Sequence, residues 1–318
     1  MATTLAFNEL KTWLSSQPEN TAGTPYEIII TSAPADGYTN AITRYVSIVG
    51  MEGTTSIGKN AFDGCSKLTS INIPESVTSI GNYAFYQCTG LSSVNIPSSV
   101  TSIGRYVFYK CLSLTSITIP SSVTSIGEGA FWDCSGLTSV NISDGVTSIG
   151  SGAFSGCSSL TSINIPEGVT SIGDGTFQSC SKLTSINIPE SVTSIGSQAF
   201  MDCSKLTSIN IPSSVTSIGN HAFYNCSSLT SINIPEGVTS IGDGAFDGCS
   251  KLTSIFMYPS FSETLMKSDS FSGTPETLKL YVPPSKLSGW QSAALSNYGF
   301  VADVTVEAMA TKKWIRIA

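Results

Sequence analysis

The chain has 318 residues, a length typical of about two ordinary domains, and 41% of them are hydrophobic, which is enough for a large core. Only 12% are charged, about half the usual share, and the net charge is −7. Nucleic acids and anionic membranes attract clustered positive charge, and the longest basic run is Lys312-Lys313, so we expect neither partner. No segment approaches the roughly 18 to 20 apolar residues of a membrane span, so no membrane insertion is expected. Residues 1–5 lack the basic and apolar regions of an export signal.

An amphipathic helix is predicted near the N-terminus, because four large apolar residues share one helical face: Phe7, Leu10, Trp13 and Leu14. Pro18 ends this helix, and residues 26–31 form a predicted strand. The segment that follows is repetitive, and a repeat array exposes core and strand edges at its ends. We therefore interpret residues 1–44 as an N-terminal cap.

A period of 23 residues dominates the middle of the chain. Eight copies follow one another without a gap from Leu68 to Lys251, with the pattern L-T-S-I-N-I-P-x-x-V-T-S-I-G-x-x-A-F-x-x-C-S-x. Phe recurs at this period from 62 to 246, and all nine Cys follow three residues after a Phe, from 65 to 249. Degenerate copies start at Tyr45 and Leu252. A fixed period of this length predicts a solenoid, in which each copy is one coil that buries its apolar face against its neighbours.

Each copy contains two short predicted strands and a closing turn. In the copy that begins at residue 68, alternating Ile residues precede Pro74, a second apolar pair precedes Gly81, and the Ala-Phe-x-x-Cys segment suits a short helical turn. Eight side chains of this copy are predicted to point inward: Leu68, Ile71, Ile73, Val77, Ile80, Ala84, Phe85 and Cys88. The predicted fold is an α/β repeat solenoid of about ten 23-residue coils, with short parallel strands and a cap at each end.

The L-x-x-I-x-I-P strand, the I-G-x-x-A-F segment and the Cys three residues after Phe resemble the BspA-like leucine-rich repeats, also called the Treponema pallidum type. The resemblance covers about residues 45–283, with residues 278–283 as a last strand. It implies a right-handed leucine-rich-repeat coil on the surface of a bacterium or a protozoan parasite, or secreted from it. It also implies adhesion to host proteins or to other cells.

Residues 284–318 are interpreted as a C-terminal cap and tail. Leu287, Trp290, Ala294 and Tyr298 form a second apolar stripe. Residues 301–318 contain alternating apolar positions to which no element is assigned. In both terminal segments we interpret the aromatic residues as capping contacts.

Catalytic and metal-binding residue patterns are scarce. The single histidine, His221, occupies a variable position, where a solvated side chain is favoured over a catalytic base. Cysteines spaced 23 residues apart do not match the spacing of zinc ligands, and stacked coils hold their Cβ atoms farther apart than a disulfide requires. We expect buried free thiols, no metal, no cofactor and no enzymatic activity.

The copies differ mainly at four positions, two after the repeated Gly and two after the repeated Phe. The outward strand positions, by contrast, are nearly always Ser and Asn and offer a partner the same surface in every coil. On three successive copies the variable positions carry aromatic and basic residues, which we interpret as a partner-binding patch: Tyr83, Tyr86, Arg105, Tyr106, Tyr109, Lys110 and Trp132. The alternative is that these rings fold over the corners of the coils as packing.

The sequence therefore favours a non-enzymatic, monomeric adhesion module at the cell surface or in secreted form. Its expected partner is a protein or glycoprotein, such as a component of the host extracellular matrix. A structural spacer without its own ligand is the alternative that near-identical copies suggest. Ice binding by the regular column of Thr residues from 78 to 239 is a third interpretation.

Overall fold

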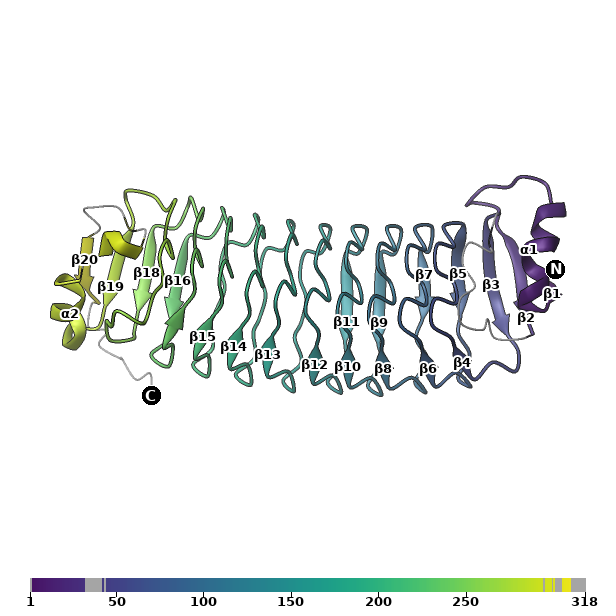
Figure 1. Ribbon diagram of the computed structural model, residues 1–318, viewed down its shortest axis with the longest axis horizontal. Coiled ribbons are helices and arrows are strands. Elements are labelled where there is room, and N and C mark those ends of the chain that lie inside the picture. Colours follow the sequence, from purple (N-terminus) through teal and green to yellow (C-terminus); the bar gives the residue numbers. More distant parts are fainter. Residues whose placement is uncertain are drawn as a thin grey trace, which may run out of the picture.

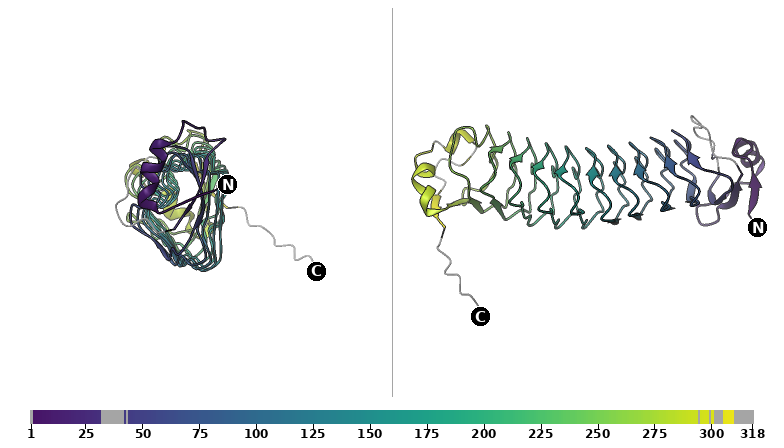
Figure 2. Two further views of the ribbon diagram at one scale, coloured as in Figure 1. Left: turned by 90° about the vertical axis from the view of Figure 1, so that its right-hand side faces the viewer. Right: turned by 90° about the horizontal axis from the view of Figure 1, so that it is seen from below.

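The chain forms an elongated, nearly straight solenoid (Figure 1). A computed structural model describes residues 2–31, 42, 44–293, 295–298, 300 and 305–309. Two rows of short parallel strands run along the solenoid, and residues 23 positions apart pair across neighbouring coils, as Ser116 does with Ser139. The coils superpose when viewed along the axis (Figure 2). The fold is the predicted leucine-rich-repeat solenoid, and it is built mainly from strands and turns.

The first row contains the L-T-S-I-N-I strands of the repeat and the terminal strands that continue them, in three separate parallel sheets. Its strands are β1 (Thr3–Leu5), β2 (Tyr26–Ile30), β3 (Val46–Met51), β5 (Leu68–Asn72), β7 (Ser93–Asn95), β9 (Ser116–Ile119), β11 (Ser139–Ile142), β16 (Ser231–Ile234), β18 (Ser254–Met257), β19 (Lys279–Val282) and β20 (Thr305–Ala308). Between β11 and β16 the first row is reduced to one isolated β-bridge, between Asn164 and Asn187. Their inter-coil bonds are long there, for example 3.4 Å from Thr230 N to Thr207 O.

The second row contains the two-residue Ser-Ile strands that follow the repeated Val-Thr. These are β4 (Ser56–Ile57), β6 (Ser79–Ile80), β8 (Ser102–Ile103), β10 (Ser125–Ile126), β12 (Ser148–Ile149), β13 (Ser171–Ile172), β14 (Ser194–Ile195), β15 (Ser217–Ile218) and β17 (Ser240–Ile241). The glycine after each strand allows neighbouring main chains to approach closely. A Cβ atom at Gly127, for example, would lie 2.6 Å from the carbonyl carbon of Gly104.

The segment from this glycine to the cysteine is not the helical turn that the sequence predicts. Its amide groups alternate: Ala84 N–H donates to Gly81 O within the coil at 3.2 Å, whereas Phe85 N–H donates to Val107 O of the next coil at 2.9 Å. Two residues of each such segment have positive φ, and a right-handed helix cannot include them. We call this segment the turn segment, and we name each coil by its buried phenylalanine.

Stacked columns of identical side chains form the core, and the eight residues predicted to point inward from the Phe85 coil are all buried. Neighbouring phenylalanine rings of the column stack with centroids 5.1 to 5.8 Å apart between Phe62 and Phe246. Phe271 continues the column at 5.0 Å from Phe246, although 25 residues separate the two. Phe7 at one end and Phe300 at the other contact the terminal rings of the column.

All nine cysteines are buried and lie outside disulfides, as the sequence predicts. The thiol of Cys88 donates to the carbonyl oxygen of Phe62, 3.0 Å away in the preceding coil, and the later cysteines repeat this contact. Burial raises the pKa of Cys134, Cys180 and Cys249 to about 12. The column is therefore both apolar filling and a set of hydrogen bonds between coils.

The predicted N-terminal helix is α1 (Phe7–Ser16), whose Phe7, Leu10 and Leu14 are buried. At the other end, η1 (Pro284–Lys286), α2 (Leu287–Gln291) and η2 (Leu295–Tyr298) follow β19. Trp290 is fully buried, and its indole N–H donates to Pro259 O at 3.1 Å. Ala294 and most of the tail, 301–304 and 310–318, lie outside the described residues.

Candidate functional site

The outward side chains of the turn segments form four columns along the solenoid, which we call the turn face. Two columns come from the two positions after the glycine, and two from the positions after the phenylalanine. The second and fourth positions have positive φ, as at Tyr83 (61°) and Lys110 (56°). Because each turn segment bonds to the next at every other amide, side chains of one column lie against their counterparts one coil away.

The structure brings together the five aromatic residues that the sequence singles out. Tyr83 stacks on Tyr106 with centroids 5.4 Å apart, and Tyr86 stacks on Tyr109 at 4.5 Å. Trp132 lies 6.3 Å from Tyr106 and 6.4 Å from Tyr109, in the next coil. All five side chains are half-buried. We call these five residues the aromatic cluster of the turn face. The rings pack on one another, as the packing interpretation expects, and they remain partly exposed, as a partner-binding patch requires.

The two cations beside this cluster do not make it positively charged. Arg105, although 57% exposed, forms an ion pair with Glu128 of the next coil. Lys110 Nζ lies 4.0 Å from a carboxylate oxygen of Asp133, also one coil away. Each cation thus faces a carboxylate 23 residues later, so the surface is nearly neutral and not basic.

Hydrogen bonds to Glu128 also hold the centre of the cluster. The hydroxyl of Tyr106 donates to Glu128 Oε1 at 2.7 Å, and this bond, together with partial burial, raises the pKa of Tyr106 to about 12. The same bond, helped by the Arg105 guanidinium, lowers the pKa of Glu128 below its ordinary value. At neutral pH the site therefore contains a protonated phenol and an ionised carboxylate.

The aromatic columns end abruptly after Trp132. In the column of Tyr83 and Tyr106 the next residue is Gly129, where a Cβ atom would overlap the Tyr106 ring. Beyond Trp132 a hollow of about 150 Å³ opens over the next coils, which we call the turn-face hollow. Its lining is formed by Glu128, Trp132, Ser151, Gly152, Ser155, Asp174, Gly175, Gln178 and Gln198. The sequence did not predict this hollow, because each copy was considered separately. The signal is the change from large to small residues at equivalent positions of the copies after Trp132.

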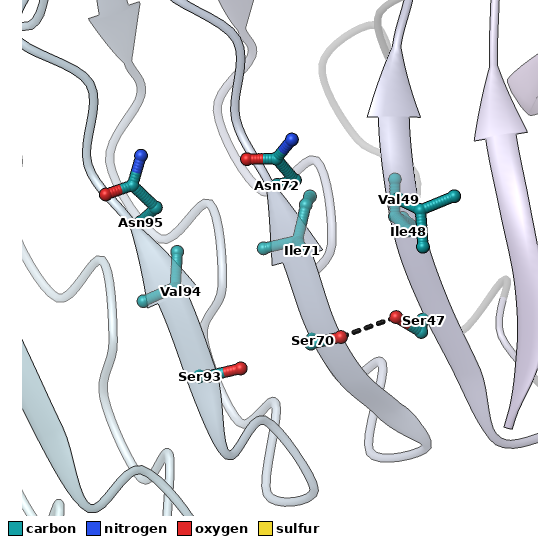
Figure 3. A pocket seen from close by; sticks show the side chains of 9 residues that line it. All are labelled: Ser47, Ile48, Val49, Ser70, Ile71, Asn72, Ser93, Val94 and Asn95. Carbon is teal, nitrogen blue, oxygen red and sulfur yellow. Dashed lines mark hydrogen bonds between the residues drawn. The ribbon is translucent and has the colours of Figure 1, made fainter. Parts of the chain in front are cut away.

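A second depression lies on the face of β3, β5 and β7, with a volume of about 390 Å³ (Figure 3). Ser47 and Ser70 hydrogen-bond across it at 2.6 Å, and the amides of Asn72 and Asn95 stand side by side on its other rim. Val49 takes the position of these asparagines in β3 and is 38% exposed. The sequence interpretation missed this residue because it treated the outward strand positions as uniform.

His221, the residue considered as a catalytic base, lies on the turn face. Its ring contacts Tyr224 at 5.6 Å between centroids, and its backbone φ is 53°. Among the described residues no three His, Cys, Asp or Glu side chains are grouped so that they could hold a metal ion. No helix in the described part of the chain is long and apolar enough to cross a membrane.

Comparisons with known proteins identify the repeat. The family described as the BspA type leucine rich repeat region, six copies long, matches residues 55–184 and 170–300. A leucine-rich repeat protein from Bacteroides ovatus is similar to this chain at 30% identity, with a TM-score of 0.64 over 82% of this chain and 68% of that one. The pneumococcal vaccine antigen PcpA shares the fold at 23% identity, with a TM-score of 0.60 over 92% and 83% of the two chains. No curated protein sequence matches the chain.

Proposed function

The chain belongs to the family of BspA-type leucine-rich repeat proteins, and on this premise we propose that it is a non-enzymatic protein-interaction module. We further propose that it acts at a cell surface or in secreted form, by adhesion to a glycoprotein of a host or partner cell. Its binding site is the aromatic cluster of the turn face, flanked by Arg105 and Lys110.

The observation that carries this proposal is the confinement of five half-exposed aromatic rings to three neighbouring coils. Tyr and Trp dominate the energetic centres of protein interfaces, because they bury a large area and lose little conformational entropy. Leu112, which is 43% exposed, belongs to the same group of coils. The later coils carry smaller or more polar residues at most of these positions.

The orientation of the rings favours a protein surface as the partner. Tyr83 and Tyr86 each stack face to face on a tyrosine of the next coil, so these pairs expose ring edges rather than ring faces. Ring edges and phenol hydroxyls suit the mixed apolar and polar surface of a protein. The near-neutral charge of the cluster does not require a charged partner.

Backbone strain at the cluster is a second line of support. Tyr83 and Tyr106 have φ of 61° and 53°, in a region that costs an L-residue about 1 kcal/mol or more. Gly129, Gly152 and Gly175 occupy the same position in the next three coils at no such cost. Tyrosine is therefore not the residue that folding alone favours here, although its stacking offsets part of the strain.

Binding to an immobilised panel of host matrix and plasma glycoproteins tests the proposal. The variant combines Tyr83→Gly, Tyr106→Gly and Trp132→Ser, each of which introduces a residue that another coil has at that position. We expect saturable binding by the parent chain and a loss of at least about 100-fold in the variant, because aromatic residues at the energetic centre of an interface contribute about 2 kcal/mol or more each.

The matched control is His221→Gly with Tyr224→Ser, which removes an aromatic pair from the same two columns outside the cluster. This control should bind like the parent. Equal loss in both variants, or retained binding in the cluster variant, would contradict the proposed site. Absence of binding by the folded parent to every glycoprotein on the panel would instead favour a structural spacer.

A further inference from the structure

We propose that the turn-face hollow receives an arginine side chain from the protein partner. This inference deepens the proposed function and rests on it, because the hollow adjoins the aromatic cluster at Trp132. It assigns a chemical group to the surface that extends from Trp132 over the next coils.

The shape of the hollow follows from the residues that replace aromatics in successive coils. After Trp132 its column continues with Ser155, while Gly152 and Gly175 occupy the neighbouring column. The indole ring borders the near end, and a Cβ atom at Gly152 would lie 3.2 Å from Trp132 Cε3. The side chains of Gln178 and Gln198 line the far end. The volume of about 150 Å³ suits one long side chain rather than a folded segment.

Hydrogen-bond acceptors predominate around this space. Glu128 and Asp174 contribute carboxylates, and the two glutamines contribute amide oxygens. Ser155 is only 4% exposed, yet its hydroxyl has no hydrogen-bond partner within the residues that the structure describes. This hydroxyl borders the hollow, so it is available to a ligand that enters the hollow.

The charge of Asp174 is not needed for the fold. Its Oδ1 accepts the N–H of Ser197 in the next coil at 2.7 Å. Asn82 and Asn220 occupy the same column and accept the equivalent amides at 2.9 and 3.0 Å with a neutral side chain. An asparagine would therefore serve the coil equally well, and the carboxylate at 174 adds a negative charge beside the hollow.

These features together fit arginine better than other groups. A guanidinium ion is planar, can stack against an indole, and donates several hydrogen bonds to carboxylate and amide oxygens. Arg105 neutralises Glu128, whereas Asp174 forms no ion pair among the described residues. The net charge of −7 on the whole chain also favours a cationic contact.

Titration with an end-blocked Gly-Arg-Gly peptide tests the hollow directly. The chain has four tryptophans, and Trp132→Phe assigns the indole N–H signal of Trp132 in a nitrogen-15 NMR spectrum. We expect this signal to shift saturably with a dissociation constant of roughly 1 to 10 mM, as suits one side chain. The same peptide with citrulline, a neutral isostere of arginine, should bind at least about ten-fold more weakly. Equal shifts with citrulline, a shift with a methyl glycoside instead, or no shift at all would overturn the proposal.

Two variants and one control variant make the test specific. Asp174→Asn keeps the bond to Ser197 and should weaken the arginine peptide about ten-fold, whereas Asp243→Asn, in the same column three coils later, should leave its affinity unchanged. Ser155→Tyr should fill the hollow and abolish peptide binding. The fold should tolerate this change, because the column already contains Tyr86, Tyr109 and Tyr224.

The same variants separate this inference from the proposed function. If the cluster variant loses the glycoprotein partner but Ser155→Tyr and Asp174→Asn bind it like the parent, the arginine contact is wrong and the proposed function stands. If the arginine peptide binds as expected but the parent chain binds no glycoprotein, the hollow is supported and the adhesion proposal fails.

Discussion

At the scale of single residues, the two positions of positive φ in each turn segment show how a change of residue alters the strain of the backbone. Each coil has two such positions, and they contain glycine in some coils and Tyr, Gln, His, Asp, Asn, Ser or Lys in others. A non-glycine residue there carries a strain that its side-chain contacts must offset. Tyr83 and Tyr106 have stacking partners, whereas Gln198 is an exposed residue at φ 56°.

Gln198→Gly should therefore stabilise the chain. We expect the free energy of unfolding to rise by about 0.5 to 1 kcal/mol, because relief of strain exceeds the additional entropy that glycine gives the unfolded chain. Urea unfolding measures the change. Gln178→Gly is the control, since Gln178 is not at positive φ and its replacement should destabilise by a similar amount. Destabilisation by both substitutions would contradict the interpretation.

The sequence identified the seven candidate residues but not their charge balance. Arg105 and Glu128 are 23 residues apart, as are Lys110 and Asp133, and this spacing is the one at which the repeat makes neighbours. Comparison along the columns, rather than within each coil, would have predicted both pairs. The ring stacking is likewise implied by the register, whereas the exposed fraction of each ring depends on side-chain conformations that the register does not determine.

At the scale of elements, the sequence predicted the strands and the inward residues well, because alternation of apolar residues is a direct consequence of strand geometry. The turn segment was misinterpreted, since Ala-Phe-x-x-Cys has apolar spacing that also suits a helix. The glycines that several copies have at two positions of the turn segment indicate backbone with positive φ, which a helix does not contain. The degenerate copy that starts at Leu252 was predicted, but its Phe271 was not recognised, because two additional residues break the period between Phe246 and Phe271.

The cysteine column predicts a marked sensitivity to alkali. Burial raises the pKa of Cys180 to about 12, whereas an unfolded thiol ionises near its ordinary value of 9.0. The folded state binds this proton more tightly, so the stabilisation is complete below about pH 9 and is lost as the pH rises toward 12. Each such thiol lowers the free energy of unfolding by up to about 1.4 kcal/mol per pH unit within that range.

Urea unfolding between pH 8 and pH 11 measures this dependence, and Cys180→Ala isolates one thiol. The variant should lose stability at pH 8 through its cavity, but its free energy of unfolding should fall less steeply with pH than that of the parent, by the contribution of one group. Identical pH slopes in the two proteins would show that the Cys180 thiol ionises equally well when folded.

At the scale of the whole molecule, one register explains the extended shape and the buried columns, because every coil repeats the contacts of its neighbour. The sequence could predict this arrangement from the period alone. It could not assign residues 305–308, which form β20 and pair with β19, because no copy of the repeat marks them. It also could not locate the hollow beyond Trp132, which arises from side chains of several coils together.

The central claim is that a glycoprotein partner binds the turn face at the aromatic cluster, and amide hydrogen exchange of the complex tests it most directly. The account predicts slower exchange on binding in residues 82–87, 105–110 and 128–133, with unchanged exchange in the equivalent segment 220–225 and in strands β9 and β11. Protection confined to the strands of the first row, with none in the three turn segments, would contradict it.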